Sequence, residues 1–140
     1  MTVAIKALDQ LISSMQPELQ PEVYVYCVWP LNKSWHGPLP LATFREKEGL
    51  TLVLTEPQAK DYQLDVLFRA RWISLTVHSA LEAVGLTAAF AQALADAGLS
   101  CNVFAGAYHD HLLVPVDQAE AAMQVLAQLQ QSKQHHRQKG

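Results

Sequence analysis

The chain has 140 residues, of which half are hydrophobic and 16% are charged, with a formal net charge of −3. This composition excludes an intrinsically disordered chain and indicates one ordinary domain or two very small ones that share a core. The charge gives no reason to expect nucleic acid, and no apolar run approaches the ~20 residues that cross a bilayer. Asp9 interrupts the N-terminal apolar residues, so they do not form a signal peptide. We expect a cytoplasmic protein that binds neither nucleic acid nor membrane.

The first half of the chain begins with apolar residues at helical spacing, which predicts an amphipathic helix over residues 3–14. Pro17 and Pro21 then punctuate the chain. The β-branched and aromatic run at residues 22–29 predicts a strand. The loop at residues 30–40 follows, and we expect its Trp35 to be the most exposed tryptophan.

Shorter elements complete the first half. Thr55 is placed to cap a short helix, with Pro57 at an early helical position. Two short strands and this helix are predicted over residues 41–46, 50–54 and 56–62.

The second half opens with a strand over residues 68–78, in which Trp72 and His78 share one face. Residues 84–97, rich in alanine and leucine, form the best predicted helix of the chain, and Gly98 is placed to end it in a left-handed conformation.

A hairpin and a last helix close the chain. Strands are predicted over residues 100–106 and 109–116. Asp117 is placed as the cap of the final helix, with Glu120 at its third position. Residues 133–140 are predicted to be a polar, solvated tail.

The second half therefore reads β-α-β-β-α and lacks only a last strand to complete the ferredoxin-like unit. The strands of the first half can supply that missing edge or build a second, reduced copy of the unit. In either case we expect an α+β fold, with an antiparallel sheet and helices on one face. The residues show no clear internal repeat.

Several segments resemble a known family, the ACT domain. A turn glycine followed by leucine opens the main helix, and the helix closes with a glycine, a hydrophobic residue and a strand that carries Asn102. The resemblance is to a small bacterial, stand-alone ACT-like branch of unassigned function, and it covers about residues 15–129. The runs that carry it lie at residues 40–46, 76–90, 94–103 and 109–115.

The resemblance implies a ferredoxin-like ACT half over residues 67–132, preceded over residues 1–66 by an N-terminal helix and a reduced ACT-like half. It also implies a regulatory or sensor module that is not an enzyme. Such a module binds an amino acid or a related carboxylate where the first strand meets the first helix, and it acts through a homodimer or a partner. No catalytic domain is attached in the sequence, and no cofactor is expected.

The candidate ligand site is the turn into the main helix together with polar groups of the following hairpin. The N–H groups of a first helical turn favour a carboxylate, while apolar side chains supply walls and polar ones fix orientation. The candidate residues are His78, Ser79, Leu81, Glu82, Val84, Gly85, Leu86, Thr87, Asn102, His109 and His111.

Other functions remain open at this point. His109 and His111 point to one face of a strand, so with His78 they are candidates for a metal site, although they lack a recognised ligand spacing. A structural interaction module without a ligand is the first alternative. The enzyme reading is weakest, because adjacent His78 and Ser79 point to opposite faces of a strand. Cys27 and Cys101 are expected to be buried, reduced thiols.

Overall fold

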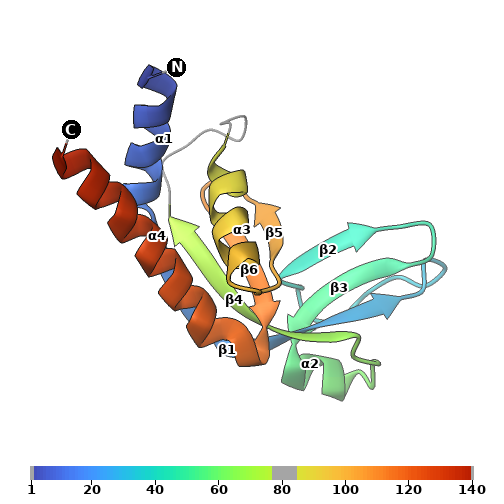
Figure 1. The fold of residues 1–140 in the computed structure, drawn as a ribbon. Helices are drawn as coiled ribbons and strands as arrows, with labels where there is room; N and C mark the ends of the chain where they lie inside the picture. Colours follow the sequence, from blue (N-terminus) through green and yellow to red (C-terminus); the bar gives the residue numbers. More distant parts are fainter. Residues whose placement is uncertain (1, 77–84, 140) are drawn as a thin grey trace. The chain divides into compact units, whose positions relative to one another are not determined.

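The fold is α+β, and the computed structural model describes residues 2–76 and 85–139 (Figure 1). Contact clustering divides the chain into two compact units. Unit 1 comprises Met1–Gln20 and Trp72–Gly140, and unit 2 comprises Pro21–Arg71. The elements are α1 Thr2–Ser14, β1 Gln16–Trp29, β2 Ala42–Arg45, β3 Leu50–Thr55, α2 Glu56–Asp61, β4 Phe68–Thr76, α3 Leu86–Asp96, β5 Asn102–Ala105, β6 Asp110–Pro115, a 3₁₀ turn Val116–Gln118 and α4 Ala119–Lys139.

The strands are hydrogen-bonded in the order β2-β3-β1-β4-β6-β5. Strand β1 lies beside β4 and supplies the last strand that the second half lacks, which confirms one of the two expectations for the first half. The pairings of β1 with β3, β2 with β3, and β5 with β6 are antiparallel. The division of the sequence at residues 66 and 67 stays a prediction, since the compact units follow packing rather than chain order.

The core of unit 1 lies between its strands and helices, and Figure 1 shows α3 and α4 on one side of β4 and β6. Phe90 and Leu94 of α3 are fully buried in it, together with Leu126 of α4. The strands contribute alternate residues, such as Ile73 and Leu75 of β4, because successive side chains of a strand point to opposite faces. The predicted one-sided arrangement of helices is confirmed within this unit.

The same alternation defines the helix-free face of unit 1. Trp72 and Ser74 of β4 point to this face, as does His111 of β6. Register places Phe104 of β5 opposite His111 and Asn102 opposite Leu113. Polar and aromatic groups therefore gather on the side of the sheet that none of the described helices of this unit covers.

Unit 2 is the smaller, reduced half. Helix α2 begins at Thr55, whose side chain accepts a hydrogen bond from the Gln58 N–H, and the Gln58 side chain accepts one from the Thr55 N–H. This reciprocal capping confirms the predicted helix start. Cys27 and Val25 of β1 pack with Ala59 of α2 in a small core.

The chain from Pro30 to Leu41 contains no helix, so unit 2 has an aromatic loop where unit 1 has α3. Trp35 packs between Trp29 and Tyr62, with ring centroids 5.0 Å from each. Its indole N–H donates to the Pro38 carbonyl at 3.0 Å. Trp35 is half-buried for this reason, as Trp29 and Trp72 also are, so its place in a loop does not make it an exposed side chain.

The two hairpins repeat each other sixty positions apart. Strands β2 and β5 both have four residues, and β3 and β6 both have six with the same burial pattern. The turn bonds correspond as well, from Glu46 N–H to Gly49 O and from Gly106 N–H to His109 O, each at 2.9 Å. This repeat was missed in the sequence, because the two copies share burial and turn geometry more than residue identity.

Two further expectations differ from the structure. Asp117 does not cap the final helix: Pro115 begins a 3₁₀ turn that leads directly into α4 at Ala119. Residues 133–139 are not an unstructured tail, because α4 continues to Lys139. Its side chains bind α1, which provides a partner that the local sequence does not reveal.

Candidate functional site

The turn into α3 is centred on Gly85, the N-cap residue of the helix. Gly85 has φ +97° and ψ −21°, a left-handed conformation that disfavours residues with a Cβ. It carries no side chain that could accept a hydrogen bond from the first N–H groups of α3. Leu86 behind it is buried and Thr87 is exposed. The described part of the turn thus combines a helix start that has no side-chain cap with an apolar base.

A cluster of candidate residues falls in the segment that precedes this turn. These residues lie outside the described part of the chain: His78, Ser79, Leu81, Glu82 and Val84. Their place in a ligand site stays a prediction.

The structure does not bring Asn102 to the turn. Gly85 begins α3, whereas Asn102 opens β5 just after the other end of that helix (Figure 1). The Asn102 amide donates to the Leu113 carbonyl at 3.4 Å, across the β5–β6 pair. Asn102 therefore has a structural role in the hairpin, at the opposite end of α3 from Gly85.

His111 is held on the helix-free face of unit 1. The Trp72 indole N–H donates to His111 Nδ1 at 3.1 Å, which places the proton of the neutral imidazole on Nε2. Burial lowers the pKa of His111, and the neighbouring His109 lowers it further, while Asp110 opposes them. The side chain is thereby fixed in its neutral form as an acceptor for tryptophan.

His109 is exposed, and its ring centroid lies 6.2 Å from that of His111. Among residues 2–76 and 85–139 no group of three or more His, Cys, Asp or Glu side chains is arranged to hold a metal ion. His111 Nδ1 is also occupied by the Trp72 N–H. These observations give the metal reading no support from the described residues.

The Trp72–His111 hydrogen bond leads to a prediction about pH. The depressed pKa of folded His111 means that the unfolded state binds the proton more readily, so this contribution to stability is present above about pH 6.5 and is lost as the pH falls through the folded value. We expect chemical denaturation to show a smaller loss of stability between neutral and mildly acidic pH for His111→Gln than for the unmodified chain. Equal slopes for the two proteins would contradict this assignment.

The two cysteines are free thiols, as expected. Cys27 is buried and Cys101 is half-buried. Burial raises the pKa of Cys101 to about 11, and burial with the nearby Asp65 raises the pKa of Cys27. Both thiols are therefore protonated at neutral pH and unsuited to nucleophilic chemistry.

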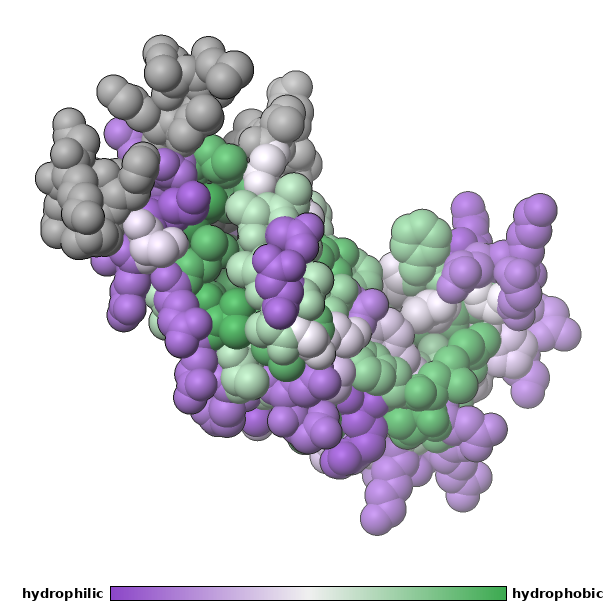
Figure 2. Space-filling view, viewed as in Figure 1, coloured by the Kyte–Doolittle hydropathy of each residue, from purple (hydrophilic) through white to green (hydrophobic). Residues whose placement is uncertain are grey.

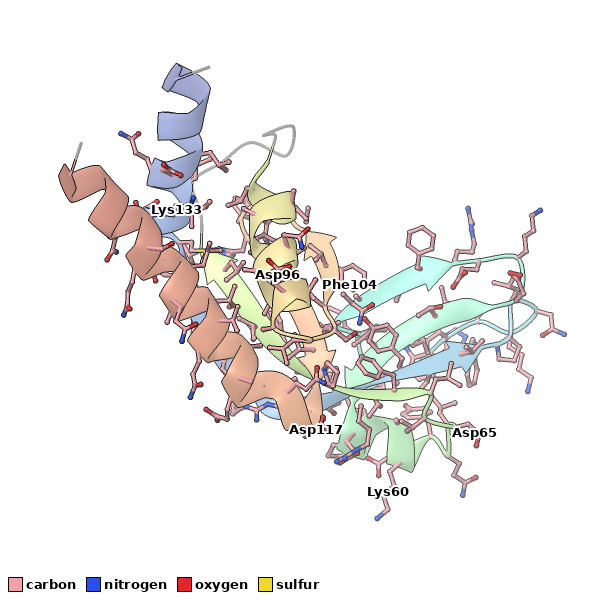
Figure 3. The ribbon with its side chains drawn as sticks, viewed as in Figure 1. Lys60, Asp65, Asp96, Phe104, Asp117 and Lys133 are labelled. Atoms are coloured by element: carbon pink, nitrogen blue, oxygen red, sulfur yellow. The ribbon has the colours of Figure 1, made fainter. Side chains whose placement is uncertain are left out.

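An open groove of ≈ 380 Å³ runs between α3 and α4. Figure 3 shows Asp96 at its α3 side. Convergent polar groups of the kind that orient a small ligand are missing from its described lining, and none of the candidate site residues contributes to it. The lining residues are Ala93, Asp96, Ala97, Val125, Gln128 and Leu129.

Comparison with known proteins decides the family. Residues 3–71 and residues 67–128 each match a family model described as ACT domain. A Vibrio cholerae protein of unknown function, described as a possible transport protein, is 46% identical, with a TM-score of 0.78 over 91% of this chain and 98% of that one. The chain belongs to the ACT domain family.

More distant structures share the ACT fold. An Agrobacterium tumefaciens protein has 16% identity and a TM-score of 0.66, covering 83% of this chain and 89% of that chain. The ligand-free regulatory subunit of aspartate kinase from Thermus thermophilus has 10% identity and a TM-score of 0.58, covering 81% and 95%. No curated protein matches the sequence.

The ACT assignment sets the class of function. This chain contains ACT domains and shares its fold with the regulatory subunit of aspartate kinase. These similarities indicate a small-molecule regulatory module. None of the helices that the structure describes is both long and apolar enough to cross a membrane.

Proposed function

We propose that this ACT protein is a sensor that binds an amino acid or a related small carboxylate at the turn into α3. The observation that carries the proposal is Gly85, a left-handed N-cap without a side chain. Unpaired N–H groups at a helix start, together with the positive end of the helix dipole, favour a carboxylate. The role is binding and regulation rather than catalysis, since both described thiols are protonated and His111 is an acceptor for Trp72.

A thermal-shift screen tests this proposal. The purified protein is heated with each of the twenty L-amino acids, with nucleotides and with divalent metal ions. A ligand that binds only the folded state raises stability by about 2.7 kcal/mol at a hundredfold excess over its dissociation constant. We expect at least one amino acid to raise the melting temperature. If no compound at millimolar concentration changes the melting temperature, a structural interaction module without a ligand replaces the sensor. If only metal ions raise the melting temperature, a metal site formed by the histidines is favoured instead.

We further propose that the sensor acts as a homodimer formed along β2. This strand lies at one end of the strand order, so one side of its backbone has no partner strand within the described sheet. Phe44 of β2 is 66% exposed, whereas Phe104 at the repeated position of β5 is half-buried. Val28 of β1, also exposed, shares a row with Phe44 because both lie opposite Thr51. In Figure 2, unit 2 shows hydrophobic surface bordered by hydrophilic side chains.

Phe44→Lys is expected to dissociate the dimer, because it places a charge in the apolar row and on an edge that must pair. Sedimentation velocity at a protein concentration of roughly tens of micromolar measures whether the chain is a dimer or a monomer. Tyr108→Lys is the matched control, since Tyr108 is an exposed aromatic residue of the other hairpin, in unit 1. If the unmodified chain is a monomer, the dimer proposal is wrong. If the Phe44→Lys protein is still a dimer, the interface does not lie along β2.

A further inference from the structure

Helix α1 is fastened to α4 by side-chain amides. The last carbonyls of any helix lack an intrahelical donor. Here Gln130 Nε2 of α4 donates to Ser13 O at 3.0 Å and to Met15 O at 2.6 Å, and Gln134 Nε2 donates to Ser13 O at 3.1 Å. The carboxyl end of α1 is therefore capped by glutamines from a helix more than a hundred residues later in the chain.

An ion pair reinforces this fastening one turn earlier in α1. The Asp9 side chain is only 7% exposed, and Lys133 Nζ lies 3.4 Å from its Oδ1. Figure 3 shows Lys133 reaching from α4 toward α1. A carboxylate buried to this degree is costly without a partner, so Lys133 and the two glutamines act together as a polar latch. The latch consists of Gln130, Lys133 and Gln134 on α4.

The latched helix stands directly against the turn into α3. Leu8, next to Asp9, places Cδ2 3.1 Å from the position that a Cβ on Gly85 would occupy. A Cβ on Gly85 would force Leu8 to shift by a few tenths of an ångström, and the positive φ of Gly85 also disfavours any other residue. One helix thus contacts both α4 and the amino end of α3, all within unit 1.

We propose that α1 is a latched cover over the turn into α3, and that the latch sets how readily a ligand reaches it. The inference rests on the proposed function for the ligand, while the cover itself is a property of the free protein. A ligand that approaches the backbone of Gly85 has to displace Leu8, so the apparent affinity is reduced in proportion to the fraction of molecules in which the cover is open. Weakening the latch therefore raises affinity.

Hydrogen exchange tests the cover without any ligand. Gln130→Ala removes one bond to Ser13 of α1 and one to Met15 just after it, whereas Gln131→Ala alters the adjacent exposed glutamine of the same helix. We expect Gln130→Ala to raise exchange by about tenfold in α1 and in the first turn of α3 together, with β6 unchanged. Gln134→Ala, which loses one bond, gives a smaller increase of the same kind. An increase in α1 without one at residues 86–90 overturns the cover, as does an equal effect of Gln131→Ala.

Binding of the twenty L-amino acids to the same variants tests the consequence. Any amino acid that binds the unmodified chain should bind Gln130→Ala severalfold more tightly and Gln131→Ala unchanged. Equal or weaker binding to Gln130→Ala overturns the latch while leaving the sensor intact. If no amino acid binds any of the three proteins, both the proposed sensor function and the control of ligand access by α1 are wrong. The exchange data then describe only a structural contact between α1 and α4.

Discussion

Replacing Phe90 by alanine is expected to lower the free energy of unfolding by about 3–5 kcal/mol, the largest effect of any single substitution considered for this chain. Phe90 is fully buried at the centre of the unit 1 core. Its removal forfeits the transfer of an aromatic ring from water and leaves a cavity that Leu94 and Leu126, on two different helices, cannot fill without moving.

Urea denaturation followed by far-UV circular dichroism measures this loss. Gln92→Ala on the same helix is the control, since Gln92 is exposed and its amide donates to Asp96 Oδ1 at 2.7 Å, a bond within the helix. That variant is expected to change stability by less than about 0.5 kcal/mol. A Phe90→Ala protein as stable as the Gln92→Ala protein would show that the core does not close around α3 as described.

Gly85→Val is expected to lower the free energy of unfolding by about 1–3 kcal/mol and to abolish ligand binding at the turn into α3. A β-branched residue at φ +97° is strained, and its Cβ lies 3.1 Å from Leu8. The same side chain covers the first N–H groups of the helix. Calorimetric titration with an amino acid identified by the screen measures the binding, and thermal denaturation measures the stability.

Gly98→Val is the matched control for strain alone. Gly98 also has a left-handed φ, +76°, but an added Cβ there meets nothing within 4 Å. It should lose stability through strain and keep ligand binding. If the Gly85→Val protein binds its ligand unchanged, the site lies elsewhere. Adding Leu8→Ala to Gly85→Val should restore part of the stability, because the two residues share one contact.

Local chemistry made some helix boundaries predictable and not others. Thr55 and Pro57 predicted the start of α2, and both halves of the capping box form there. The similar pattern at Asp117 misled, because Pro115 two residues earlier sets a 3₁₀ turn and the helix proper begins at Ala119. Gly98 ended α3 as predicted, since only its own φ matters for that role.

Elements that depend on distant partners were harder to predict. Pro17 and Pro21 suggested a break, yet β1 runs through both from Gln16 to Trp29. Strand β3 pairs only with the part of β1 from Tyr24 onward, so the missing N–H groups of the two prolines cost no bond to β3. The helical end of α4 likewise depends on α1, a partner that no local pattern in the sequence names.

The candidate site was predictable only in part. The turn glycine was recognised from the sequence and has the backbone conformation of a helix start. Asn102 was predicted to face the turn if the two neighbouring strands paired. In the structure α3 lies between Gly85 and Asn102 along the chain and separates them. Leu8 was missed altogether, because nothing in an amphipathic helical pattern shows which of its apolar residues will meet a glycine far along the chain.

Unit 2 is one continuous stretch of chain, whereas unit 1 is assembled from both ends of it. This discontinuity constrains the order of folding. During synthesis unit 2 is complete once Arg71 has emerged, while the segment before Pro21 must wait for Trp72 and the residues that follow. Pairing inside unit 2, such as Leu67 N–H to Tyr26 O at 2.9 Å, brings the two flanking segments together and so reduces the loop-closure entropy that unit 1 has to overcome. We therefore expect unit 2 to fold first and to lower the entropic cost of closing unit 1.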